Sequence, residues 1–192
     1  MKTKFKGEPG YTRYRKLRLL AGVITGFALV LIIFAAGYFI FGNPKNYITI
    51  LAVLIVLPTV KVFVQYVMVP WKNSAPKEEY ERLSSVCAPL HLYCELIMTA
   101  QEKTFEILYI LIDKNENIIA YTLNQKADAE KFEKGVTNFL NYYNFDSKVK
   151  LYNDLSQFEK KAKTLASNNK ELTSEQKEHI ELIFEKLSIM SI

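Results

Sequence analysis

Two long apolar stretches lie near the start of the chain, and each has the length of a membrane-spanning helix. Residues 19–41 form a run of 23 residues without a charge. At a rise of about 1.5 Å per residue, such a helix crosses a hydrocarbon core about 30 Å thick. The second stretch, residues 47–70, is apolar but is interrupted by Lys61 and Gln65. We therefore expect one transmembrane helix over residues 19–41 and another over residues 47–70.

The five residues between these stretches, 42–46, read Gly-Asn-Pro-Lys-Asn, which is the composition of a turn. Because so short a loop joins antiparallel neighbours, the two stretches predict a helical hairpin. A cleaved secretory signal is the alternative interpretation. It fits poorly, because the apolar region of a signal is shorter and this one continues past residues 35–37 into further aromatic side chains.

After residue 74 the spacing of apolar positions changes from segment to segment, as is typical of a folded domain. Residues 74–97 show helical spacing, with Ser74 as a candidate N-cap and Pro89 expected to kink or divide the helix. Residues 104–112 and 118–123 are rich in β-forming side chains and are joined by five turn-forming residues. This pattern predicts a β-hairpin.

The rest of this segment alternates between helix and strand. We expect a helix over residues 129–143, a strand over residues 148–152, a helix capped by Asp154, and a last helix with a capping box of Thr173 and Gln176. A strand, helix, strand order favours a parallel, right-handed connection. The expected fold class is a membrane-anchored α+β protein, with the hairpin followed by one domain, residues 74–192, in the order α-β-β-α-β-α-α. Its three-stranded sheet has an edge that a neighbouring copy or the last helix could complete.

Charge divides the chain at the same place as the hydrophobic pattern. Residues 1–73 carry ten Lys and Arg and, among acids, Glu8 alone, which is a net charge of +9. Residues 74–192 carry 15 Lys and Arg and 19 Asp and Glu, a net charge of −4, and together the two parts give the +5 of the chain. A nucleic-acid-binding domain needs clustered positive charge on the folded unit itself, so we expect no nucleic-acid partner.

The positive charges also predict an orientation in the membrane. Seven Lys and Arg precede the first apolar stretch, within a basic segment over residues 1–18, whereas Lys45 is the only one in the 42–46 loop. Positive charge stays on the cytoplasmic side, so both termini are expected in the cytoplasm, with the hairpin in the plasma (inner) membrane and the loop outside. The side chains expected to anchor the hairpin at anionic lipid of the cytoplasmic face are Arg13, Arg15, Lys16, Arg18, Trp71 and Lys72.

Two features within the apolar stretches are candidates for function. Gly22 and Gly26 form a GxxxG pattern, which lets helix backbones approach closely, either within the hairpin or between two copies. Pro58, Lys61 and Gln65 fall on one face of the second helix. Lys61 is near enough to the cytoplasmic end for its side chain to reach the headgroups. Alternatively, this face lines an aqueous path between several copies or contacts a partner helix.

The candidate metal ligands are Cys87, His91 and Cys94, whose spacing would put them on one face of the expected helix. Zinc usually takes four ligands, however, and no CxxC or HExxH motif accompanies them. Both cysteines also lie on the side expected to pack against the sheet, where a free cysteine acts as a small hydrophobe. We therefore expect core packing here, and neither a metal nor another cofactor.

No group of residues has the spacing that catalysis requires. The segment after residue 74 has a single glycine, Gly135, and it contains no GxSxG elbow and no glycine-rich phosphate loop. A helix with Glu95 or Glu102 before a hairpin with Asp113 weakly resembles the metal-binding nuclease core of restriction enzymes. The strand that should carry the Glu-x-Lys of that core reads Ile-Ile-Ala-Tyr-Thr-Leu, which departs from the pattern.

These observations favour a non-enzymatic membrane protein. Its cytoplasmic domain would act as an adaptor or an assembly subunit, in a homo-oligomer or with a protein partner. Two alternatives remain: a homo-oligomeric pore or membrane-disrupting effector, and a membrane-tethered metal-dependent enzyme such as a degenerate nuclease-like domain.

Overall fold

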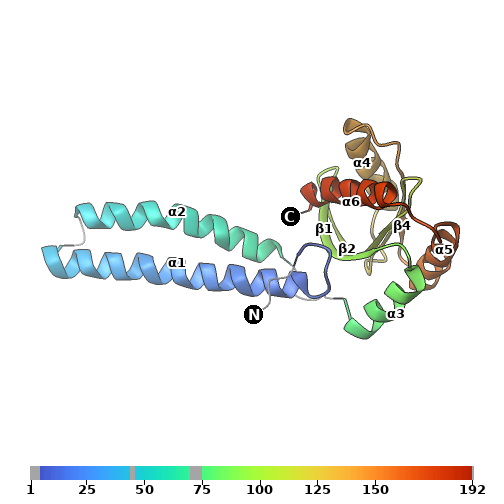
Figure 1. Cartoon of the computed structure of the whole chain (residues 1–192). Coiled ribbons are helices and arrows are strands. Elements are labelled where there is room, and N and C mark those ends of the chain that lie inside the picture. The colour runs from blue at the N-terminus through green and yellow to red at the C-terminus, as the bar shows by residue number, and fades with distance from the viewer. Residues whose placement is uncertain (1–4, 44–45, 70–74, 192) are drawn as a thin grey trace. The chain divides into compact units, whose positions relative to one another are not determined.

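The computed structural model describes residues 5–43, 46–69 and 75–191 of the chain (Figure 1). The chain divides into two compact units. Residues 13–71 form the first, which we call the hairpin unit, and residues 1–12 together with 72–192 form the second, the sheet unit. The predicted cap Ser74 and the predicted anchors Trp71 and Lys72 lie outside the described residues.

Two helices make up the hairpin unit, α1 (Tyr11–Phe41) and α2 (Tyr47–Met68), and both are long and apolar enough to cross a membrane. Asn46 caps α2 by accepting a hydrogen bond from the Thr49 N–H at 2.9 Å. Its side-chain amide donates to the Gly37 carbonyl at 3.0 Å, so the turn is tied to the end of α1. Helix α1 begins well before residue 19, because helical structure continues through the basic segment.

Glycine lets α1 and α2 approach closely. A Cβ on Gly26 would lie 2.7 Å from the Thr59 side chain, and one on Gly22 would lie 3.4 Å from Val62. Thr59 is buried in this contact, and its hydroxyl is satisfied by the Ile55 carbonyl one turn earlier, at 2.8 Å. The structure thus places both glycines of the GxxxG pattern in the contact within the hairpin.

The sheet unit is an α+β fold with a four-stranded mixed sheet in the order β1-β2-β3-β4. Strands β1, β2 and β3 are antiparallel, and β3 and β4 are parallel. Six consecutive residues of β2, from Ile107 to Ile112, are buried, so both faces of the sheet are covered. The elements are α3 (Lys77–Cys87), β1 (Leu92–Ala100), β2 (Lys103–Ile112), β3 (Asn117–Tyr121), α4 (Ala129–Tyr142), β4 (Lys148–Tyr152), α5 (Leu155–Asn168) and α6 (Ser174–Ile189).

The fourth strand corrects the sequence prediction of three. The helix expected to run to residue 97 ends at Cys87, and residues 92–100 form β1 instead. Pro89 cannot continue a helix, because it has no N–H and its ring clashes with the preceding turn. Residues 92–98 are all buried and, apart from Glu95, apolar, and this pattern fits helical spacing as well as strand spacing. The observed order is α-β-β-β-α-β-α-α.

Downstream of β1 the predicted elements are present. The β2–β3 hairpin, the parallel pairing of β3 with β4 and the helix between them follow the sequence pattern. Asp154 caps α5 by accepting the Ser156 N–H at 2.8 Å. Thr173 and Gln176 form the expected capping box of α6.

Residues 5–10, which we call the strap, cover the free edge of β1. Cys94 donates its N–H to the Gly7 carbonyl at 3.0 Å, in an antiparallel bridge. The Lys6 ammonium donates to the carbonyls of Ser188 and Ser191, both at 3.0 Å, at the C-terminal end of α6. Gly7 has a φ of +92°, and a Cβ there would lie 2.8 Å from the Phe184 ring, so this position requires glycine.

Glu95 joins the strap to the sheet. Its buried carboxylate accepts the backbone N–H groups of Gly10 at 2.6 Å, Thr12 at 2.8 Å and Ala75 at 2.9 Å. Gly10 and Thr12 stand at the start of α1, whose first turn has no acidic residue of its own. Glu95 therefore supplies, from β1, both the acceptors and the negative charge that a helix N-terminus favours.

We predict that Glu95→Ala lowers the free energy of unfolding by about 3 kcal/mol, because three backbone donors lose a charged acceptor. Glu102→Ala is the matched control, since Glu102 is an exposed glutamate with the same left-handed backbone, φ +63° against +57° at Glu95. Chemical denaturation of the full chain in detergent, with hydrogen exchange at Gly10 and Thr12, measures the effect. Equal losses in both variants would contradict a role for the carboxylate.

Candidate functional site

A cleft of about 620 Å³ opens on the sheet unit. Its walls come from the start of β1, from the first half of α6 and from the strap. The lining is largely apolar, with three side chains that can carry charge. The lining residues are Phe5, Pro89, His91, Tyr93, Leu172, Lys177, Ile180, Glu181 and Phe184.

Aromatic rings form one side of the cleft. The rings of Tyr93 and Phe184 stack with centroids 3.6 Å apart and an interplanar angle of 8°. His91 packs edge-on against Tyr93 at 4.5 Å. Phe5 adds an exposed ring from the strap. Flat, rigid surfaces of this kind bind planar or apolar groups with little loss of side-chain entropy.

Burial and charge change the titration of two of these rings. Withdrawal from water, together with the Glu181 carboxylate, raises the pKa of Tyr93 to about 12, so this phenol stays neutral. Partial desolvation lowers the pKa of His91 below its ordinary value, while the carboxylates of Glu181 and Glu8 oppose this shift. His91 is thus neutral at pH 7, and it can both donate and accept a hydrogen bond.

The strap positions two groups at this cleft. Phe5 forms part of the wall, and its N–H donates to the Glu8 carboxylate at 3.3 Å. The bridge between Gly7 and Cys94 holds this turn against β1. The sequence predicts a basic cytoplasmic segment over residues 1–18. No local signal indicated that the strap would fold onto a strand more than 80 residues later.

The candidate metal ligands do not share a helix face, because the helix ends between them. Cys87 closes α3, His91 precedes β1, and Cys94 lies within β1. Both cysteines are buried, and desolvation, followed by the Glu159 carboxylate, raises the pKa of Cys87 to about 11. Among the described residues, no three His, Cys, Asp or Glu are arranged to hold a metal ion. The strand β3, which the nuclease resemblance would require to carry acids, reads Asn-Ile-Ile-Ala-Tyr.

The predicted lipid anchors take different positions on α1. Arg13 and Arg18 are exposed, and Arg15 is half-buried. Lys16 is buried instead, where it donates to the carbonyl of Val69 at the C-terminal end of α2 and lies 5.2 Å from the centre of the Tyr66 ring. A cation at a helix C-terminus is stabilising, so Lys16 joins the two helices at their basic end.

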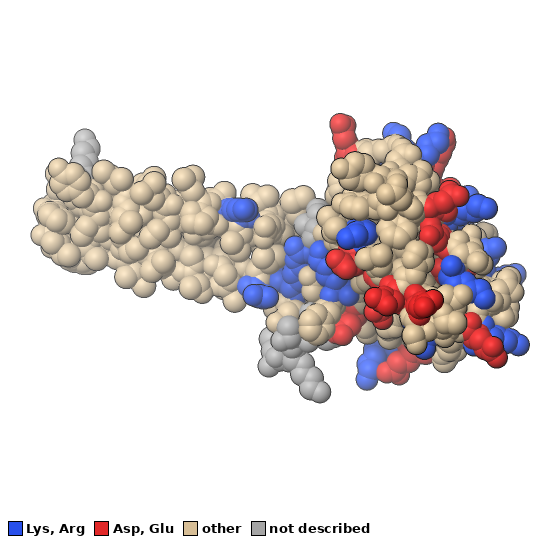
Figure 2. All heavy atoms as spheres, turned by 45° about the horizontal axis from the view of Figure 1, so that its top comes forward, with Lys and Arg blue, Asp and Glu red and all other residues tan. Residues whose placement is uncertain are grey.

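The three candidates on α2 lie on its surface to different extents. Pro58 and Lys61 are exposed, and Gln65 is half-buried. On the face that Figure 2 shows, charged side chains of both signs are interspersed over the sheet unit, whereas the hairpin shows a few Lys or Arg side chains and no Asp or Glu.

Elsewhere on the sheet unit, a histidine and a glutamate form a contact that the sequence did not indicate. The Nε2 of His179, on α6, lies 2.9 Å from Glu116 Oε1, in the β2–β3 turn. Glu116 Oε2 and the hydroxyl of Ser147 are buried without a hydrogen-bond partner. The residues are more than 60 positions apart, and hydrophobic periodicity carries no information on such a contact.

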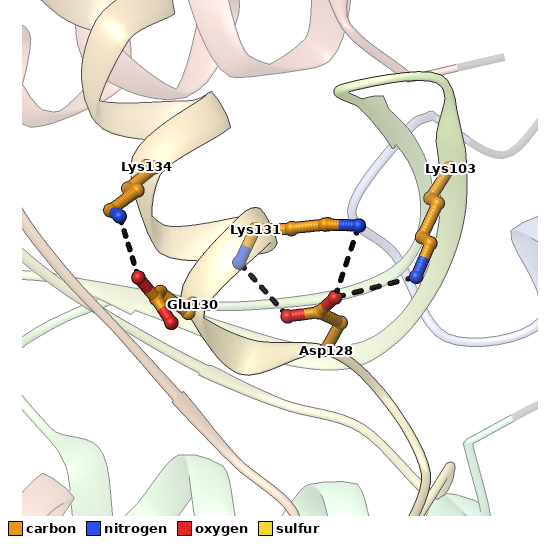
Figure 3. Close-up of polar contacts among 5 residues, drawn as sticks. All are labelled: Lys103, Asp128, Glu130, Lys131 and Lys134. Carbon is orange, nitrogen blue, oxygen red and sulfur yellow. Dashed lines mark hydrogen bonds and ion pairs between the residues drawn. The ribbon is translucent and has the colours of Figure 1, made fainter.

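A cluster of charged side chains at the start of α4 serves as a helix cap (Figure 3). Asp128 accepts the Lys131 N–H at 3.2 Å and pairs with the ammonium groups of Lys103 at 3.3 Å and Lys131 at 3.6 Å. The backbone hydrogen bond, followed by the Lys103 contact, lowers the pKa of Asp128. Its charge is already balanced, and the cluster supports the start of α4.

Comparison of the chain with family models, with curated proteins and with solved structures finds no significant match. The geometry of the cleft is therefore the basis for assigning a site. Stacked rings beside one imidazole, one ammonium and one carboxylate are typical of a surface that binds an apolar or aromatic group and orients it with a few polar contacts.

We predict that acidification from pH 7 to pH 5 destabilises the sheet unit through His91. The pKa of His91 is lowered in the folded state, so the unfolded chain binds more protons in this range. The stabilising contribution is therefore present above about pH 6.5 and is lost as the pH falls through the folded pKa. Thermal unfolding of the full chain in detergent measures the loss.

The variant His91→Gln should flatten this pH dependence, while His179→Gln, which removes the only other histidine, should not. An identical decline in the native chain and in His91→Gln would show that other groups cause it.

Proposed function

We propose that this is an integral membrane protein whose hairpin anchors a cytoplasmic interaction domain, which acts as an adaptor or an assembly subunit. The α1–α2 hairpin is the anchor, and the cleft of the sheet unit is the surface that binds a partner.

Exposed apolar surface on the hairpin unit carries the proposal. Within the most apolar stretch of each helix, 6% of the residues in α1 and 11% in α2 are buried. The core helix of a water-soluble protein would have most of this stretch covered. Lipid is the medium in which a hairpin can leave so many Leu, Ile, Val and Phe side chains uncovered.

The distribution of charge supports the orientation. Residues 13–71 contain no Asp or Glu, and the positive side chains Arg13, Arg15 and Arg18 gather at the start of α1. The Lys16 contact with Val69 shows that the C-terminal end of α2 lies at this same end of the hairpin. Positive charge favours the cytoplasmic side, so both termini belong in the cytoplasm of a plasma (inner) membrane, with anionic lipid at this end.

The composition of the cleft supports an interaction role. Protein-binding surfaces combine aromatic side chains with a rim of polar groups. Here the exposed Phe5 and the more buried Tyr93–Phe184 pair line the same cleft as Lys177 and Glu181. A partner side chain would insert beside the rings, and the charged groups would orient it.

For the orientation, we predict that Asn43→Cys, in the α1–α2 turn, reacts with a membrane-impermeant maleimide in intact cells. Asn141→Cys, exposed on α4, should react only after permeabilisation. Cys87 and Cys94 are buried, so they contribute little background. Extraction of the chain by alkaline carbonate, or labelling of Asn141→Cys in intact cells, would overturn the proposed anchoring or topology.

For the role, we predict that the chain, extracted gently from its host into lipid nanodiscs, has a native mass that includes at least one other protein. Phe184→Asp, which places a charge against the Tyr93 ring in the cleft, should remove that added mass, whereas Ile189→Asp, at an exposed position of the same helix, should keep it. Native mass spectrometry measures both. A mass equal to the chain alone would contradict an adaptor, and a purely homo-oligomeric mass would favour the pore.

A further inference from the structure

Pro58, Lys61 and Gln65 form a stripe along α2, which we call the polar seam. Their spacing of three and four residues puts them on one side of the helix. Pro58 has no N–H, so the carbonyl of Leu54, one turn earlier on the same side, lacks its usual helical donor. A freed carbonyl, an ammonium and a side-chain amide thus lie along one line in a helix that is otherwise almost entirely apolar.

The polar seam does not face α1. The side of α2 that packs on α1 is marked by the buried residues Ala52 and Thr59, and by the approach of Thr59 to Gly26. At about 100° per residue, Lys61 lies roughly 200° around the helix from Thr59. Pro58 and Lys61 are accordingly exposed. Packing within the hairpin uses one side of α2, and it leaves Pro58 and Lys61 uncovered and Gln65 partly covered.

An uncovered seam of this kind is costly in lipid. Charged and amide side chains within a span are rare, and they usually face another helix or a water-filled cavity. Lys61 lies about 10 Å before the end of α2 and could direct its ammonium toward the headgroups. That movement would supply no hydrogen-bond partner to the Gln65 amide or to the freed Leu54 carbonyl on the same side. A second helix laid along the seam would satisfy all three groups together.

Charge distinguishes between two candidates for this helix, a second copy of the hairpin and a helix of another protein. Residues 13–71 contain no acidic side chain, so a second copy of the hairpin would bring a second positive charge at Lys61 and no negative charge to balance it. A side chain that balances the charge of Lys61 must therefore come from a different chain. We propose that the polar seam binds a transmembrane helix of another protein, and that Lys61 pairs there with an Asp or Glu of that helix. This inference rests on the proposed membrane anchoring and adds the chemistry of the partner.

The test uses synthetic transmembrane peptides as probes. The full chain is reconstituted in vesicles of phosphatidylcholine and phosphatidylglycerol with a labelled Leu/Ala peptide that carries one Glu. Seven peptides move this Glu by one residue at a time through the inner half of the helix, which covers every face and the depth of Lys61. The matched peptides carry Gln instead, and energy transfer at pH 8 reports association.

We expect at least one Glu peptide to associate about tenfold more tightly than its Gln counterpart. Lys61→Leu should remove this preference, and Lys61→Glu should transfer it to a peptide with Lys at the same position. As a matched control, Val67→Leu changes an exposed residue on another side of α2 and should leave the preference intact. Exchanging the charges of the two partners distinguishes a direct ion pair at position 61 from a general effect of the substitution on α2.

Three results would overturn the inference. Equal binding of the Glu and Gln peptides would mean that Lys61 directs its charge to the headgroups. Preserved preference in Lys61→Leu would place the contact elsewhere. Energy transfer between differently labelled copies of the chain, lost in Lys61→Leu, would make a second copy the occupant. Retention in the vesicles during alkaline extraction is measured in the same samples, so failure of the anchoring is distinguished from failure of the pairing.

Discussion

The Glu95 carboxylate accepts hydrogen bonds from Gly10, Thr12 and Ala75, and the arrangement of the sheet unit's N-terminal part depends on this contact. A buried carboxylate is tolerated when donors surround it, and backbone donors at a helix start are otherwise left without partners. The backbone N–H groups therefore offset the cost of burying the carboxylate, and the carboxylate gives these N–H groups an acceptor. As a consequence, Gly10 and Thr12 at the start of α1, and Ala75 two residues before α3, are all held at β1.

The strap, in turn, completes both the sheet and the cleft. Strand β1 lies at the edge of the sheet, and an uncovered edge invites pairing with other chains. Gly7 covers this edge at Cys94, and Ser191 covers it at Met98, so the two ends of the chain share the task. The same strap carries Phe5 into the wall of the cleft. Removing the strap would expose the edge and open the binding surface at once.

Pro89 marks the place where the observed fold departs from the sequence prediction. The residues after it are apolar at nearly every position, and the spacing of Leu90, Tyr93, Cys94 and Ile97 predicts a kinked helix. A strand buried on both faces gives the same pattern, and the choice is made by pairing with β2, which lies outside any local window. Because the helix ends at Cys87, the candidate metal ligands Cys87, His91 and Cys94 do not share a helix face.

The sequence by itself determined the elements whose signals are local. These are the two apolar helices and their short turn, the β2–β3 hairpin, the α4 and β4 segments, and the caps at Asp154 and Thr173, because charge, periodicity and capping act within a few residues. Tertiary structure alone decided that the strap docks on β1 and that Glu95 accepts three backbone N–H groups. It also decided that His179 pairs with Glu116 and that the cleft forms. Each of these joins residues many positions apart, and such contacts depend on how the sheet and helices pack, which no local pattern encodes.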